Sequence, residues 1–218
     1  MPIAEMKSVP GWAGAARAAA GYAGMLCLLA ALAGCGGSAI FQVRVERPVV
    51  QPAEWVIAVF PLDDSGAKGE IKDYTLAGRT GGQGSGAMFA RRISRAVAAG
   101  GRFRVIDETA LRNLMLDEKL TSPELSRLDD RRAGELGRRL GANLVVRGRV
   151  VTYEKSWFLF VPKAKALLEL RGLDPATGET IWSATLGDSS TSRSGETLIS
   201  RIAADACRAI AEGLGAPR

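Results

Sequence analysis

The chain opens with a stretch that has the order of a secretion signal, and this stretch decides how much of the sequence is left to fold. Lys7 and Arg17 give a weakly basic start, and residues 18–32 are almost wholly apolar and end in small side chains. An apolar run of about 15 residues is too short to span a bilayer but suits the central region of a signal peptide. We therefore expect residues 1–34 to be removed during export.

Cys35 follows this run directly, in the sequence Leu32-Ala33-Gly34-Cys35. These residues resemble the lipobox of bacterial lipoproteins, in which acyl chains such as palmitate are attached at the cysteine and the chain is cut just before it. The resemblance implies that Cys35 is the first mature residue and the lipid anchor. Several acyl chains tether a protein firmly, since each buried methylene contributes about 0.8 kcal/mol. The alternative is an ordinary secretory signal that leaves Cys35 as a free thiol.

The remaining chain is of ordinary size and only mildly basic. Removing 34 residues from 218 leaves 184, which is ample for one domain and short for two. Without Lys7, Arg17 and Glu5, the 29 basic and 23 acidic residues give a net charge of +5. These charges are scattered, so we expect no nucleic-acid partner. We expect a lipidated tether over 35–53 and a single domain over 54–215.

Histidine is absent from the whole sequence. This absence excludes the commonest general base, the Ser-His and Cys-His nucleophile pairs and most kinds of zinc site. The acidic residues Asp63, Asp64, Asp107 and Glu108 have no spacing that enforces proximity, and structural caps explain them more simply. We therefore expect no catalytic residues, no metal and no cofactor.

Glycine-rich residues 81–86 precede an expected helix and raise the question of a phosphate-binding loop. A P-loop closes with a Lys-Ser or Lys-Thr pair, and Ala87-Met88 stand there instead. A dinucleotide-binding fingerprint needs its glycines directly after a strand, and this context is not met. We interpret the stretch as a loop whose Ser85 caps the helix.

Alternating or β-branched runs predict the strands, and apolar residues at helical spacing predict the helices. The expected strands are 40–45 at a sheet edge, 55–60, 103–107, 144–151, 165–173 and 180–184. The expected helices are 87–98, one capped by Asp107, 129–140 with Gly141 at its end, and 198–214. The turn signal at 174–178 predicts that the last two strands form a hairpin.

The clearest strand, 144–151, has one apolar face. Leu144, Val146 and Val150 point to that face, and Leu168 and Leu170 repeat the pattern on the next strand. We expect these five side chains to form the main core.

The opposite face would bring Arg147 and Arg149 beside Glu169 and Arg171. Cross-strand charge pairing is one explanation, although each such pair contributes little. The alternative is a patch that faces a protein partner, which makes Arg147, Arg149 and Arg171 candidate interface residues.

Residues 156–162 form the densest cluster of large apolar side chains outside the expected strands and helices. Two interpretations give the segment a role in the fold alone: it extends the flanking strands, or it folds back over the sheet as a lid. A third makes Trp157, Phe158, Leu159 and Phe160 an exposed tip that meets a bilayer or another subunit. The flanking lysines suit anionic headgroups.

Four blocks follow one another along the chain: residues 56–64, 101–107, 141–150 and 174–179. In this order they resemble the CsgG-like lipoproteins, whose relatives include the LpoB activators of peptidoglycan synthases and the amino-terminal domain of TolB. The resemblance covers about Trp55 to Leu214. It implies an anticodon-binding-domain-like α/β sandwich, for which we expect a mixed sheet of about five strands and about four helices. It also implies a periplasmic location, assembly into rings and no catalytic residues.

The chain departs from the curli channel of this family in its links between strands. The channel has long insertions that supply membrane-crossing strands, and each such strand needs about 9 to 11 residues. Here residues 152–164 and 186–195 are the corresponding links, and they are too short for transmembrane hairpins.

The favoured function is a non-enzymatic, outer-membrane-anchored lipoprotein facing the periplasm. It would assemble with itself, or dock to an envelope secretion or surface-assembly system through a protein partner. The alternative is an LpoB-like activator that binds a peptidoglycan synthase. Gly36 favours the outer membrane, because inner-membrane retention in Gram-negative bacteria typically uses Asp after the cysteine.

Replacing Cys35 with Ser should block lipidation and the cleavage that follows it, because the lipid is attached to the cysteine sulfur. Mass spectrometry should find an acylated amino terminus at Cys35 in the wild-type protein and an uncut chain in Cys35→Ser. An unmodified but normally cleaved amino terminus in the native protein would contradict the lipobox interpretation.

Overall fold

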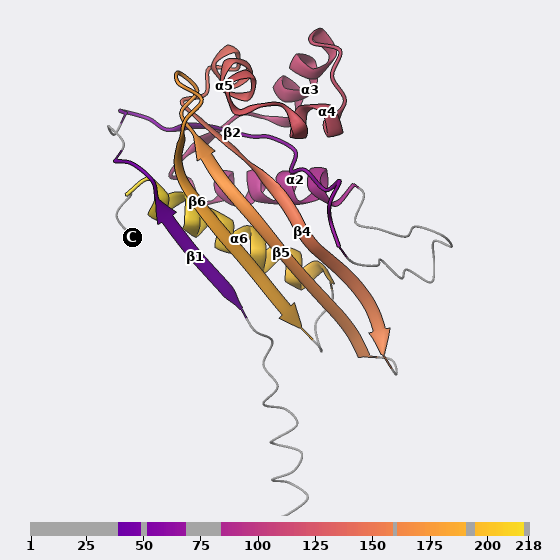
Figure 1. Cartoon of the computed structure of the whole chain (residues 1–218). Coiled ribbons are helices and arrows are strands. Elements are labelled where there is room, and N and C mark those ends of the chain that lie inside the picture. Colours follow the sequence, from indigo (N-terminus) through magenta and orange to yellow (C-terminus); the bar gives the residue numbers. More distant parts are fainter. Residues whose placement is uncertain (1–38, 49–51, 69–83, 159–160, 191–194, 216–218) are drawn as a thin grey trace, which may run out of the picture. The chain divides into compact units, whose positions relative to one another are not determined.

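The structure is a computed structural model that describes residues 39–48, 52–68, 84–158, 161–190 and 195–215 (Figure 1). The predicted signal peptide, Cys35 and most of the glycine-rich stretch lie outside these ranges.

A mixed sheet of six strands forms the centre of the fold. The strands are β1 (Ile40–Val45), β2 (Val56–Val59), β3 (Arg104–Val105), β4 (Leu144–Phe158), β5 (Val161–Leu173) and β6 (Thr180–Ser190), in the order β1-β6-β5-β4-β2-β3. β2 is parallel to β3 and β4, and the other pairs are antiparallel. The predicted edge strand at 40–45 and the predicted β5–β6 hairpin are both confirmed.

Five helices accompany the sheet in the described ranges. They are α2 (Ser85–Ala99), α3 (Glu108–Asp117), α4 (Ser122–Arg127), α5 (Asp130–Arg139) and α6 (Gly195–Gly213). The predicted α/β class is confirmed, with six strands and five helices where about five and about four were expected. α4 has no counterpart among the predicted helices.

Side-chain caps fix where two of these helices begin. The Asp107 carboxylate accepts a hydrogen bond from the backbone N–H of Ala110 at 2.8 Å, as predicted. Asp129 does the same for Arg132 at 2.8 Å. Gly141 follows α5 with a φ of 74°, a left-handed conformation that favours glycine and ends the helix.

The prediction that Ser85 caps α2 is wrong. The capping position belongs to Gly84, whose φ is 87°, and no side chain there bonds the helix. The Asp64 carboxylate instead accepts a hydrogen bond from the backbone N–H of Gly86 at 3.0 Å. Gly86 itself allows the helix to approach closely, because a Cβ there would lie 1.9 Å from the Leu62 carbonyl oxygen.

Two hydrophobic cores lie on opposite faces of the sheet. α2 and α6 cover one face, and α3, α4 and α5 gather over one end of the other (Figure 1). On β4, Val145 points toward the second group of helices and Val146 toward the first; on β5, Leu173 and Leu170 divide in the same way. This arrangement leaves much of β4, β5, β6 and β1 without a helix on their second face.

The predicted main core is confirmed. Leu144, Val146, Val150, Leu168 and Leu170 are all buried in the core beneath α2 and α6. Burying such side chains is the dominant stabilising term in a domain of this size.

A β-bulge in β4 interrupts the alternation of its side chains. The register with β5 shifts between Val150 and Thr152, so Tyr153 points to the helices in place of Thr152. The Tyr153 ring meets the Phe89 ring edge to face, with centroids 5.4 Å apart.

Trp182 connects α6 to the sheet. Its side chain is wholly buried and fits where Gly172 and Gly213 leave space. A Cβ at Gly172 would lie 2.1 Å from Nε1 of the indole, and one at Gly213 would lie 2.5 Å from Cγ. Both positions therefore need glycine for the helix and strand to close on the ring.

Val146→Asp should unfold the domain, because an unpaired buried carboxylate costs several kcal/mol, which is comparable to the whole stability of a domain. Thermal melting followed by circular dichroism measures the effect. Val45→Asp, at a β1 position that is 53% exposed, is the matched control and should melt near the wild type. A Val146→Asp protein that melts within a few degrees of wild type would show the core assignment to be wrong.

Candidate functional site

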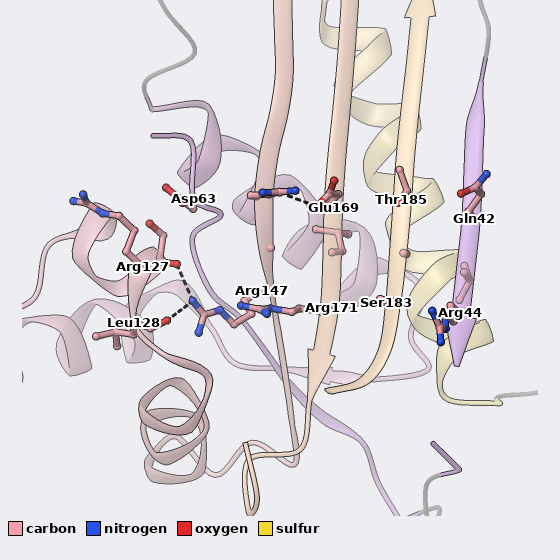
Figure 2. Close-up of a pocket in the computed structure, with 16 residues that line it drawn as sticks. Gln42, Arg44, Asp63, Arg127, Leu128, Arg147, Glu169, Arg171, Ser183 and Thr185 are labelled. Atoms are coloured by element: carbon pink, nitrogen blue, oxygen red, sulfur yellow. Dashed lines mark hydrogen bonds and ion pairs between the residues drawn. The ribbon is translucent and has the colours of Figure 1, made fainter. Parts of the chain in front are cut away.

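The uncovered part of the sheet forms the floor of a groove of about 830 Å³ (Figure 2). Its lining comes from β4 (147–149), β5 (169–171), β6 (183–185), β1 (42–44), the end of α4 (126–128) and Asp63. Five arginines and two acidic residues are among these lining residues. The groove is therefore rich in guanidinium groups.

The predicted arginine face lies within this groove. Arg147 pairs in register with Arg171, and Arg149 pairs with Glu169. Arg149 Nε donates a hydrogen bond to Glu169 Oε2 at 2.7 Å (Figure 2). Charge pairing therefore accounts for part of the predicted patch, while the side chains of Arg149 and Arg171 stay 63% and 42% exposed.

Arg147 differs from the other two arginines because its side chain is only 5% exposed. Its Nη2 donates hydrogen bonds to the carbonyl oxygens of Ser126 at 2.9 Å and Leu128 at 2.5 Å. Burial lowers the pKa of Arg147, and the Asp130 carboxylate opposes that shift. Arg147 thus holds the end of α4 against β4 and forms a wall of the groove.

Asp130, at the start of α5, binds two arginines with one oxygen. Its Oδ1 lies 3.0 Å from Nη1 of Arg147 and 2.8 Å from Nη2 of Arg171. These contacts are ion pairs rather than well-directed hydrogen bonds. The shared carboxylate allows two like charges to stand opposite each other on neighbouring strands.

The groove offers the chemistry of a binding surface. Exposed guanidinium groups suit carboxylates, to which arginine can donate two parallel hydrogen bonds. The Ser183 hydroxyl in the groove donates to Glu46 Oε1 at 2.9 Å. Within the described residues, no three His, Cys, Asp or Glu side chains gather as a metal site.

Asp130, Ser126 and Leu128 belong to this site but were not among the predicted site residues. All three belong to α4, its end or the start of α5. A capping box marks the start of α4, in which Thr121 and Glu124 bond each other's backbone N–H groups. This Thr-x-x-Glu pattern was the sequence signal that could have located the helix.

The predicted aromatic segment lies at the far end of the β4–β5 hairpin. Trp157 pairs with Pro162 and Phe158 with Val161, so the backbone of these residues continues the two strands. Leu159 and Phe160 lie outside the described residues. Two lysines beside the tip, Lys163 and Lys165, are exposed on β5.

In the part of the chain that the structure describes, no helix combines the length and apolar character that crossing a membrane would take.

Comparison with solved structures finds several similar chains. A PelC dodecamer from Paraburkholderia phytofirmans is 16% identical with a TM-score of 0.43, covering 75% of this chain and 97% of that one. Lipoprotein GNA1162 from Neisseria meningitidis is 16% identical with a TM-score of 0.48, covering 72% and 99%. The LpoB C-terminal domain from Escherichia coli is 19% identical with a TM-score of 0.37, covering 61% and 81%. Comparison with curated protein sequences finds no match.

A family model described as "Curli production assembly/transport component CsgG" matches residues 37–157. The match spans more than half of the chain, from before β1 almost to the end of β4. It agrees with the resemblance carried by the blocks at 56–64, 101–107 and 141–150. The chain therefore belongs to the CsgG family.

Proposed function

We propose that this protein is an outer-membrane-anchored periplasmic lipoprotein that acts in an envelope secretion or surface-assembly system as a non-enzymatic component. It assembles with itself or docks to a protein partner of that system. The observation that carries the proposal is the family match over residues 37–157, since the family is described as an assembly and transport component. The lipobox at Cys35 and the following Gly36 support the anchor and its membrane.

The length of the tether supports one orientation on the membrane. Cys35 precedes Ile40 by five residues, which span at most about 18 Å when extended. Ile40 pairs with Gly187, which pairs with Leu167 on β5. The hairpin tip at Val161 lies six residues beyond Leu167, or about 20 Å further along the strand. The distance from Ile40 to the level of the tip is therefore about what the tether can span, and this supports a contact between the tip and the bilayer in the proposed arrangement.

The chemistry of the tip supports the same orientation. Trp157, Phe158 and Phe160 are residue types that suit a membrane interface. Lys163 and Lys165 stand exposed beside the tip, where anionic headgroups would attract them. The opposite end of the sheet, with α3, α4 and α5, then faces the periplasm.

The arginine groove is the docking surface in this proposal. Arg149 and Arg171 present exposed guanidinium groups to a partner's carboxylates. Arg147 acts through position, because it holds the wall at Ser126 and Leu128.

Mild crosslinking followed by pulldown of the lipidated protein from envelopes should recover a secretion or surface-assembly component. Arg149→Ala combined with Arg171→Ala should reduce that recovery with little change in the melting temperature, because the Arg149–Glu169 pair is exposed and Asp130 keeps Arg147 as its partner when Arg171 is removed. Arg131→Ala, whose side chain on α5 is 88% exposed outside the groove, is the control and should leave recovery unchanged. Recovery of a peptidoglycan synthase instead would overturn the leading proposal and favour the activator function.

Changing Trp157, Phe158 and Phe160 to Ser together should weaken binding of the delipidated protein to anionic liposomes while the melting temperature stays near wild type. Liposome sedimentation and thermal melting measure the two effects. Val45→Ser, an exposed apolar position at the other end of β1, is the control. A sharp fall in melting temperature with unchanged liposome binding and oligomer size would assign the segment to the core.

A further inference from the structure

β1 is an edge strand of the sheet. β6 pairs with it on one side, and no strand of the described ranges lies on its other side (Figure 1). Its pairing with β6 has no bulge, and no proline or lysine interrupts the strand. Bulges, prolines and lysines are usual means by which proteins keep other strands from an edge. The open edge of β1 therefore has none of these protections.

The backbone of β1 offers hydrogen-bonding groups on this open side. The N–H of Glu46 donates to the carbonyl oxygen of Ile181 at 2.8 Å, which continues the register between β1 and β6. In an antiparallel pair, residues that bond the neighbouring strand alternate with residues whose N–H and C=O point away from it. Phe41, Val43 and Val45 are the alternating residues, and no other described residue bonds their outward groups. The edge is thus a template for one more strand.

Exposed apolar side chains gather on the same strand. Three large apolar residues are exposed in the described ranges, and two of them, Ile40 and Val45, stand at the two ends of β1. They are 39% and 53% exposed. A strand added at this edge would cover apolar surface as well as bond the backbone. Both features are typical of a site where a peptide strand joins a sheet.

The two faces of β1 differ in chemistry. Phe41, Val43 and Val45 lie on the face toward α6, and the first two pack against the core there. Gln42 and Arg44 lie on the opposite face, in the arginine groove (Figure 2). A strand beside β1 would meet apolar side chains on one face and polar side chains on the other. A segment in which apolar and polar residues alternate fits both faces.

The charge of the groove decides which polar residues fit the second face. The Arg44 side chain is 80% exposed and lies 3.3 Å from the Glu46 carboxylate. Five arginines and two carboxylates line the groove, and Glu46 and Asp130 add two further carboxylates beside it. Five positive charges against four negative ones leave a small positive excess. Acidic side chains therefore fit this face better than basic ones.

We propose that β1 receives an extended segment of a different protein, in which apolar and acidic residues alternate, as a further antiparallel strand of the sheet. Its apolar side chains lie beside Phe41, Val43 and Val45, and its acidic side chains lie beside Gln42 and Arg44. The pairs β1–β6, β6–β5 and β5–β4 are all antiparallel, so the added strand continues the same pattern. The contact goes beyond the docking at the arginine groove and rests on the proposed function only for the orientation of β1 on the membrane.

The tether argues against a second copy as the added strand. β1 begins five residues after Cys35 and, in the proposed arrangement, runs away from the bilayer in every copy. Two copies on one membrane therefore present β1 strands that run in the same direction. An antiparallel pair of β1 strands would need one copy upside down, with its hairpin tip away from the bilayer. A segment of another protein has no such restriction.

Amide hydrogen exchange, followed by NMR in the full-length lipidated protein in detergent micelles, tests the contact. The probe is a peptide of about seven residues in which valine and glutamate alternate. The amides of Phe41, Val43 and Val45 should exchange fast alone and at least about tenfold more slowly with excess probe, because they gain hydrogen bonds. A peptide of the same composition, with valines and glutamates in separate blocks, is the control and should have no such effect.

Two results of this measurement would overturn the proposal. One is exchange at these three amides that the alternating probe leaves unchanged. The other is slow exchange before the probe is added, and if dilution made it fast, the edge would belong to a second copy.

Val45→Pro separates backbone pairing from side-chain contact. Proline is tolerated at a strand edge where the N–H points away from the sheet, but it cannot donate to an added strand. Val45→Pro should weaken probe binding by about tenfold, with a melting temperature near wild type. Val45→Thr keeps the N–H and the branched shape and should bind nearly as well as wild type. Equal binding by the two variants would overturn the proposal.

A lysine version of the probe tests the preference for acidic residues. Replacing its glutamates by lysine should weaken binding by about threefold, as for a surface ion pair, and Arg44→Glu should reverse the order of the two peptides. Equal binding of both peptides to the wild type would overturn the acidic part of the proposal. The pulldown through the arginine groove is a separate measurement, so its failure alone would contradict the proposed function and not the strand contact.

Discussion

The open face of the sheet depends on the Asp130 carboxylate, which forms ion pairs with two arginines on neighbouring strands. The register of β4 and β5 places Arg147 directly opposite Arg171, and like charges in that position destabilise a sheet. Asp130 lies between them, within 3.0 Å of both. Because Asp130 begins α5 and Arg147 also binds two carbonyl oxygens near the end of α4, the same ionic cluster places both helices against the sheet. The wall of the groove follows from this placement.

Most of the fold could be predicted from the sequence because its strands and longer helices have regular patterns. The core face of β4 and β5 follows from simple alternation, and Asp107 and Gly141 mark helix ends through familiar backbone chemistry. α4 was missed because six residues are too few to show an apolar period. The predicted cap of α2 was wrong because the carboxylate that bonds there, Asp64, is 22 residues away from Gly86 in sequence.

The candidate site could be predicted only in part, for a related reason. Alternation along β4 and β5 placed three arginines on one face, and the structure has them there. The burial of Arg147 could not be read from alternation, because the carbonyl oxygens it binds belong to residues 126 and 128, near a helix that was not predicted. The different roles of Arg147, which is buried, and of Arg149 and Arg171, which are exposed, depend on contacts between segments that are far apart in the sequence. The strand pattern is local, but the helix that buries Arg147 is not.

The buried position of Trp182 between Gly172 and Gly213 has a consequence for its fluorescence. The indole ring is shielded from water, and within the described residues no group accepts a hydrogen bond from its Nε1–H. An indole in such an apolar setting emits at short wavelength and is out of reach of aqueous quenchers. Any separation of α6 from the sheet would admit water to the ring and move its emission to the red. With the other tryptophans replaced by phenylalanine, Trp182 would therefore be an intrinsic optical reporter of the contact between the last helix and the sheet.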